Sequence, residues 1–132
     1  MRQGRVRFVV VVLTMFAVLV LPSCGFKRKL VSITVIPDTA DIVGAGVQVQ
    51  FKAIGNYVHP PDSRDITDSV AWESAAPQIV TIDQTGLATS TAGCGTKITI
   101  TATGHSDPHD DSSGIVVGTA SVSVTQPNNG CP

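Results

Sequence analysis

Two polar stretches hold the side chains that could bind a metal ion. Residues 104–114 read GHSDPHDDSSG, and residues 55–69 read GNYVHPPDSRDITDS. The alternation Asp-x-His-x-Asp that begins at Asp107 is typical of a calcium-binding loop. Ser112, however, stands where that loop needs glycine, and Gly118 stands where it needs glutamate. The sequence therefore excludes an EF-hand at this position.

A looser cation site, shared between the two stretches, is a second interpretation, because calcium accepts oxygen ligands from several carboxylates. The candidate ligands are Asp62, Asp65, Asp107, Asp110 and Asp111. Zinc bound by His105 and His109 would need both histidines on one helix face, which Pro108 disfavours. The remaining interpretation, which the composition favours, is that Asp, Ser, Gly and Pro form turns in solvated loops.

The sequence contains no pattern that indicates catalysis. It has no Gly-x-Ser-x-Gly, no phosphate-binding loop and no paired carboxylates on a defined scaffold. We therefore predict a protein that is not an enzyme and that uses no cofactor. Tyr57 precedes the rigid His59-Pro60-Pro61 segment, and it either contacts a partner or packs against the edge of the domain.

The N-terminal segment predicts export from the cell. Three arginines within residues 1–7 precede 14 mostly apolar residues, Phe8 to Leu21. This run is shorter than the roughly 20 residues of a spanning helix, and its layout is typical of a secretory signal peptide. An uncleaved helix is the alternative.

The charge of the chain beyond Lys29 is uneven, with three basic and ten acidic residues, a net of −7. Such a balance argues against nucleic-acid binding and favours simple solubility.

Leu21-Pro22-Ser23-Cys24 resembles the lipobox of bacterial lipoproteins. The resemblance implies a signal peptide at residues 1–23, removed by cleavage, and a diacylglycerol on Cys24, usually with an acylated amine such as a palmitoyl amide. An ordinary signal peptide followed by an unmodified Cys24 is the alternative. Residues 24–29 form a basic tether that could rest against anionic headgroups. By resemblance to enteric lipoproteins, which use aspartate after the cysteine for inner-membrane retention, Gly25 implies the outer membrane.

Residues 30–126 alternate between apolar and polar side chains in seven short runs, separated by Gly, Pro, Asp and Asn. This periodicity predicts an all-β fold, a seven-stranded antiparallel sandwich. The expected strands are VSITVIP, GVQVQFKAIG, SVAWES, IVTID, GLATS, TKITITAT and GIVVGTASVSVT. The predicted core includes Phe51, Trp72, Ile98, Ile100 and Val122. In the first strand, Val31, Ile33 and Val35 are expected to lie on one inward face. In the second strand, the expected inward residues are Val47, Val49, Phe51 and Ala53.

These strands together resemble the group 2 bacterial immunoglobulin-like domain of intimin- and invasin-type surface proteins. The most specific matching stretch is Asp65-Ile66-Thr67 followed by Val70-x-Trp72-x-Ser74. Further matches are Ile33, Val35, Pro37, Gly46, Phe51, Ala53, Ile79 to Asp83, Gly86-Leu87-x-Thr89, Ala92-Gly93 and Ile98 to Thr103. The resemblance implies an immunoglobulin-like sandwich and, as a class, adhesion or the spacing of modules at cell surfaces.

The predicted topology has consequences at both ends of the domain. Cys94 precedes the sixth strand and Cys131 follows the seventh, so a disulfide between them would hold the tail at residues 127–132 against the turn. At the other end, the loops at 55–69 and 104–114 are expected to lie together beside residue 30. These acidic loops would then face the membrane to which the tether is attached.

The sequence thus predicts a lipid-anchored, monomeric immunoglobulin-like module of the bacterial cell envelope. It would face the surface or the periplasm and bind a protein or glycan that the sequence does not identify. Its contact with the membrane would be made through the lipid on Cys24. The alternative function is an accessory envelope subunit or small enzyme with a calcium site in the acidic loops at 55–69 and 104–114.

Overall fold

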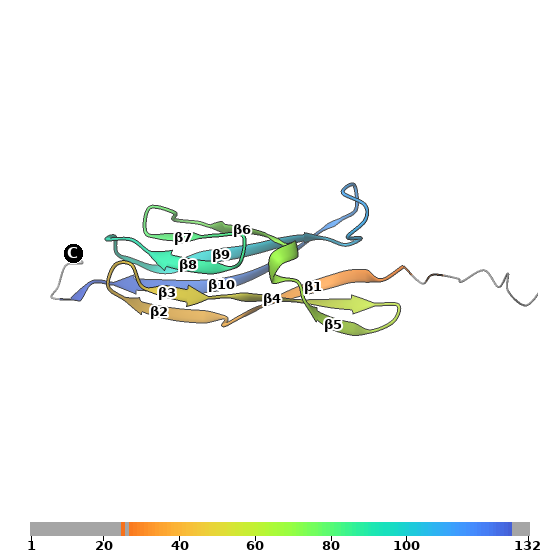
Figure 1. The fold of residues 1–132 in the computed structure, drawn as a ribbon, viewed down its shortest axis with the longest axis horizontal. Helices are drawn as coiled ribbons and strands as arrows, with labels where there is room; N and C mark the ends of the chain where they lie inside the picture. The colour runs from red at the N-terminus through yellow and green to blue at the C-terminus, as the bar shows by residue number, and fades with distance from the viewer. Residues whose placement is uncertain (1–24, 26, 128–132) are drawn as a thin grey trace, which may run out of the picture.

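The computed structural model describes residues 25 and 27–127, which form an elongated β-sandwich (Figure 1). Cys24, the segment before it and Cys131 lie outside the described residues. Within them are ten strands and one short 3-10 helix, η1 (Thr67–Ser69). The strands are β1 (Lys29–Ile36), β2 (Thr39–Val43), β3 (Gln48–Gln50), β4 (Lys52–Val58), β5 (Asp62–Asp65), β6 (Ala71–Ser74), β7 (Val80–Ile82), β8 (Leu87–Ser90), β9 (Gly95–His105) and β10 (Ile115–Thr125).

The strands form two layers around one core. One layer is the four-stranded sheet β2-β10-β9-β6, and the other consists of the sheets β1-β4-β5 and β3-β8-β7. These two smaller sheets follow each other along the domain, because β3 and β4 are consecutive parts of one extended run interrupted at Phe51. The Phe51 amide donates to the carbonyl of Gly86 at 2.8 Å, which keeps this interruption hydrogen-bonded.

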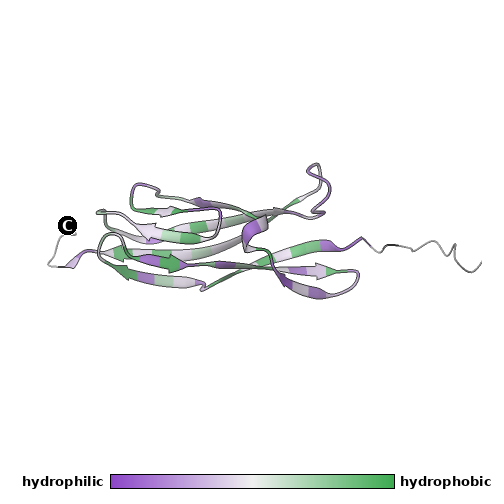
Figure 2. Cartoon of the chain, in the orientation of Figure 1, coloured by the Kyte–Doolittle hydropathy of each residue, from purple (hydrophilic) through white to green (hydrophobic). Residues whose placement is uncertain are grey.

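Alternation between apolar and polar residues explains why these segments become strands, and Figure 2 colours the strands by the hydropathy of each residue. Along β9, Ile98, Ile100 and Ala102 point inward while their neighbours are more exposed, and Ala120, Val122 and Val124 do the same on β10. Thr, Val and Ile suit such half-buried, pleated surfaces. The five predicted core side chains, Phe51, Trp72, Ile98, Ile100 and Val122, are all buried. The fold class predicted from the periodicity is therefore confirmed as an all-β sandwich.

The number of strands predicted from the sequence, seven, was wrong. β2 and β5 were missed, and the predicted run from Gly46 to Gly55 is divided into β3 and β4. β2 presents one fully buried side chain, Ile42, and is defined by its parallel pairing with the end of β10. The sequence of β5, DSRD, has no apolar residue at all. Both strands exist because tertiary hydrogen bonding overrides weak local preference.

The inward face of β1 was predicted incorrectly at its start. Leu30 is buried there, whereas Val31 is 48% exposed. The pairing of β1 with β4 shifts register between Leu30 and Ser32, so one extra residue lies opposite the partner strand. Such a bulge reverses the alternation on its N-terminal side, because the side-chain period of a strand is two. Val47, also predicted to face inward, is 40% exposed because it precedes β3 in the turn.

Chain direction places the loops at the two ends of the sandwich. The β4–β5 hairpin and the β9–β10 loop lie at the end where β1 begins, and the turns before β3 and β9 lie at the other (Figure 1). The amide of Leu30 donates to the carbonyl of Ser106 at 2.8 Å, which fixes the start of β1 beside the β9–β10 loop. The predicted neighbourhood of the two polar loops and residue 30 is confirmed. Among the described residues, no helix is long and apolar enough to cross a membrane.

Candidate functional site

A cleft of about 530 Å³ opens at the end of the sandwich where β1 begins. Three segments that are distant in sequence form it: the residues before β1, the β4–β5 hairpin and the β9–β10 loop. The lining residues are Gly25, Lys27, Arg28, Tyr57, Arg64, Asp107, Pro108, His109 and Asp110. The cleft therefore combines both charge signs with one aromatic side chain, at the place where the chain enters the domain.

The β4–β5 hairpin supplies the first wall. Tyr57 pairs with Asp62 across the hairpin, and Gly55 pairs with Arg64. Nε of Arg64 donates to Oδ2 of Asp62 at 2.6 Å, and these residues are two apart and so on the same face of β5. This hydrogen bond from Arg64 holds the pKa of Asp62 below its usual value. This wall thus presents the half-buried ring of Tyr57 and the guanidinium of Arg64, whose orientation is set by its hydrogen bond to Asp62.

The β9–β10 loop supplies the opposite wall, and its own hydrogen bonds shape it. The backbone amide of His109 donates to Oδ1 of Asp107 at 3.0 Å, and the amide of Ser112 donates to Oδ1 of Asp110 at 2.9 Å. The hydroxyl of Ser112 bonds the same Asp110 oxygen and, with that amide, holds the pKa of Asp110 below its usual value. These bonds are those of Asx turns, which fix the loop without a metal ion.

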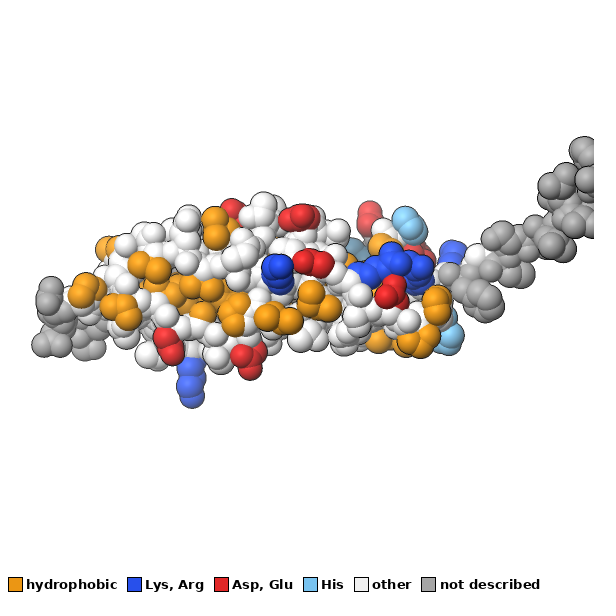
Figure 3. Space-filling model, turned by 60° about the horizontal axis from the view of Figure 1, so that its bottom comes forward, with side chains coloured by type: hydrophobic (Ala, Val, Ile, Leu, Met, Phe, Trp, Pro, Cys, Tyr) orange, Lys and Arg blue, Asp and Glu red, His pale blue; other side chains and the backbone are white. Residues whose placement is uncertain are grey.

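The charge of this end differs from the acidic end that the sequence predicted. Lys27, Arg28 and Arg64 line the cleft together with only two carboxylates, Asp107 and Asp110. Nζ of Lys27 lies 4.0 Å from Oδ2 of Asp107, so the side chain of Lys27 reaches the β9–β10 loop. Figure 3 shows basic, acidic and histidine side chains intermixed there. The carboxylates that line the cleft therefore have cationic side chains as neighbours.

The five carboxylates considered as calcium ligands are not brought together into one site. Asp62 pairs with Arg64, and Asp107 and Asp110 each bond their own loop. Asp65 lies in a separate groove beside Lys52, where its carboxylate accepts from the amide and hydroxyl of Thr67, and these bonds lower its pKa. Asp111 is exposed. In residues 25 and 27–127, no three His, Cys, Asp or Glu side chains are grouped as metal ligands would be.

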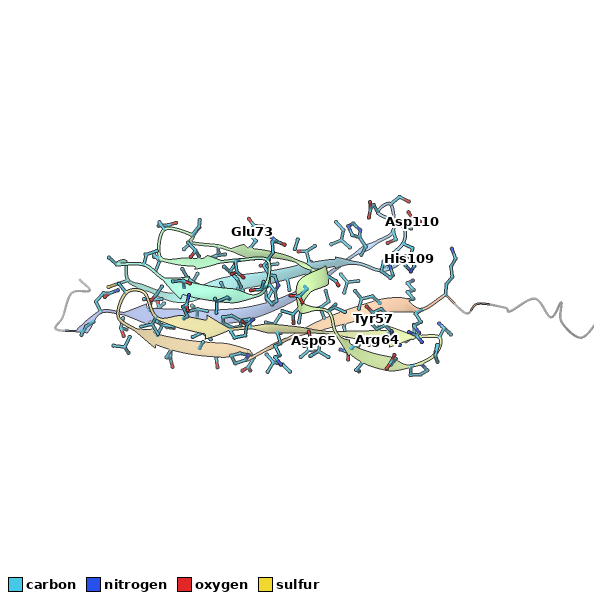
Figure 4. The ribbon with its side chains drawn as sticks, viewed as in Figure 1. Tyr57, Arg64, Asp65, Glu73, His109 and Asp110 are labelled. Carbon is cyan, nitrogen blue, oxygen red and sulfur yellow. The ribbon has the colours of Figure 1, made fainter. Side chains whose placement is uncertain are left out.

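The sequence interpretation missed the cationic part of the cleft. It treated Arg64 only as a contribution to net charge, and it assigned the basic tether to lipid headgroups alone. The i, i+2 spacing of Asp62 and Arg64 could have indicated a paired strand face, but only if β5 had been predicted. Figure 4 shows Tyr57 and Arg64 on one side and His109 and Asp110 on the other.

This architecture matches a known protein family. The family model described as "Bacterial Ig-like domain (group 2)" matches residues 31–108, more than half of the 132 residues. The match extends from β1 into the β9–β10 loop, and β10 completes the sandwich by pairing with both β9 and β2. No curated protein matches the chain.

Proposed function

Because the chain belongs to the group 2 bacterial immunoglobulin-like family, we propose that it is a non-catalytic binding or structural module anchored to a bacterial envelope membrane by a lipid on Cys24. Domains of this family are structural or binding modules. The apolar run and the lipobox-like Leu21-Pro22-Ser23-Cys24 support the anchor. Gly25 after the cysteine favours the outer membrane, and the partner would be a protein or a glycan.

One observation carries the proposal: the described chain enters and leaves the sandwich at opposite ends. β1 begins beside the β9–β10 loop, whereas β10 ends beside the turn that joins β2 to β3, where the amide of Gly44 donates to the carbonyl of Thr125 at 2.8 Å. A lipid on Cys24 would hold the first end close to the bilayer. The long axis of the domain would then separate the membrane from the far end, as in a spacer or presenting module (Figure 1).

The anchor is tested by replacing its attachment residue. Cys24→Ser should abolish metabolic labelling with palmitate and release the protein from the membrane fraction, because the thioether can form only on the cysteine sulfur. Cys94→Ser is the matched control and should leave labelling unchanged. Retained palmitate in the Cys24→Ser protein would disprove lipidation at this residue, and loss in both variants would point to failed export.

The predicted Cys94–Cys131 disulfide remains a prediction, since Cys131 lies outside the described residues. Non-reducing peptide mapping of the mature protein should recover Cys94 and Cys131 in one linked pair. Cys94→Ser should lower the free energy of unfolding by about 3 kcal/mol, because the bridge restricts the unfolded chain. Quantitative alkylation of both thiols in the native, unreduced protein would exclude the bridge.

A further inference from the structure

We infer that the cleft at the start of β1 binds the zwitterionic phosphoethanolamine headgroup of a membrane lipid. The phosphate would meet the guanidinium side of the cleft, and the ammonium would meet the carboxylates of the β9–β10 loop. This inference extends the proposed function, since it assigns a ligand to the membrane-facing end of an anchored domain. It makes the cleft a second point of contact with the bilayer beside the lipid on Cys24.

The layout of charge carries the inference. Arg64, on β5, lies on one side of the cleft, and Asp110, in the β9–β10 loop, lies on the other (Figure 4). Lys27, Arg28 and Arg64 line the same cleft as Asp107 and Asp110, so a ligand with a single charge would meet groups of its own sign as well as groups of the opposite sign. A ligand with a phosphate and an ammonium a few bonds apart can satisfy both walls at once, and charge-assisted hydrogen bonds to ionised groups are the stronger kind.

Individual groups are available for these contacts. Arg28 lines the cleft and makes no hydrogen bond or close ion pair among the described residues, although its charge acts on the nearby Asp62, so its guanidinium donors can meet a phosphate. The hydrogen bonds that Ser112 donates to Asp110 both go to Oδ1, which leaves Oδ2 for an ammonium. The hydrogen bonds from Ser112 hold the pKa of Asp110 below its usual value, so this carboxylate is ionised at neutral pH.

The position of the cleft selects a lipid headgroup as the source of this zwitterion. Lys27 and Arg28 belong to both the cleft and the tether, and Lys27 follows Cys24 by three residues. Three extended residues span at most about 11 Å. A lipid on Cys24 would therefore hold the cleft at the headgroup layer, where zwitterionic headgroups are far more concentrated than any soluble ligand. The high local concentration makes even weak headgroup binding effective.

The binding of a ligand in the cleft can be followed through a single tyrosine side chain. Tyr57 is the only tyrosine of the sequence, and its half-buried ring lines the cleft. Full-length protein labelled with ¹³C-tyrosine, in neutral detergent, therefore gives one ring signal from the site. The probes are glycerophosphoethanolamine, glycerophosphoglycerol, ethanolamine and a neutral disaccharide. The variants are Arg28→Gln and Asp110→Asn, with Lys97→Gln and Asp41→Asn as charge-matched controls outside the cleft.

Glycerophosphoethanolamine should shift the Tyr57 signal saturably, with an affinity at least about tenfold above that of glycerophosphoglycerol or ethanolamine. Arg28→Gln and Asp110→Asn should each weaken this binding about tenfold, and the two controls should leave it unchanged. Equal binding of glycerophosphoglycerol, a response to the disaccharide alone, or no shift with any probe would each overturn the inference. Free headgroups reach the cleft without an anchor, so this result does not depend on palmitate labelling of Cys24.

Discussion

Replacing Trp72 with alanine is expected to lower the free energy of unfolding by about 3–5 kcal/mol, a large part of the stability of a domain of this size. The side chain is 6% exposed, and its Nε1 donates to the carbonyl of Thr67 at 2.9 Å. The indole thereby joins β6 to the 3-10 helix η1 while filling the space next to the β7–β8 turn. Alanine would leave a cavity and would remove the donor of a buried hydrogen bond.

Trp72→Phe separates the two contributions. Phenylalanine keeps most of the buried ring but cannot donate to Thr67, so the expected loss is smaller, about 1–3 kcal/mol. Both values follow from urea unfolding monitored by circular dichroism, since the only tryptophan is the one removed. A loss below 1 kcal/mol in Trp72→Ala, or a solvent-like fluorescence maximum in the folded wild type, would contradict the buried position of this ring.

The second large effect is expected at Gly86, in the turn between β7 and β8. Gly86 has φ of +77°, and a Cβ there would lie 2.5 Å from the carbonyl oxygen of Phe51 and 3.1 Å from Cζ2 of Trp72. Gly86→Ala therefore combines a left-handed backbone, costing about 1–2 kcal/mol, with overpacking that typically costs 1–3 kcal/mol. The expected loss in the free energy of unfolding is about 2–5 kcal/mol.

Gly46 offers a matched control for this substitution. Its φ is +74°, almost the same as at Gly86, but a Cβ at this position would have no atom within 4 Å. Gly46→Ala should therefore cost only the backbone contribution, about 1–2 kcal/mol. The difference between the two variants measures the close approach of the Phe51 carbonyl. Equal losses in urea unfolding would show that this contact does not constrain Gly86.

The parts of the fold that the sequence predicted correctly depend on local signals. The strands IVTID and GLATS were predicted with only two residues between them, and the amide of Gly86 does donate to the carbonyl of Asp83 at 3.1 Å in the turn that joins them. Oδ1 of Asp83 also accepts from the amides of Thr85 and Leu87. Such turn chemistry is encoded in four adjacent residues, and glycine at the left-handed position follows from backbone sterics. Gly86 occupies such a position, with a φ of +77°.

The candidate site could be predicted only in part, because it depends on which loops lie together and on how they are shaped. The predicted topology was sufficient to place the β4–β5 hairpin and the β9–β10 loop at the same end of the sandwich. Arg64 faces the cleft because it lies on β5, a strand that forms through backbone hydrogen bonds to β4. The polar sequence DSRD gives no local signal for this strand. Asp107 and Asp110, two of the residues that suggested calcium, are used instead in turns within the β9–β10 loop.

The sequence by itself determined that this is an all-β domain with Trp72 and the alternating residues of β9 and β10 in its core, because apolar alternation and turn residues act over short distances. Only the tertiary structure decided that β2 pairs parallel with β10, that Leu30 rather than Val31 is buried, and that the tether's cations meet the carboxylates of the β9–β10 loop. Each of these results depends on register or on contacts between segments far apart in the chain. A shift of one residue reverses a strand's faces, and local preference is too weak to set that register.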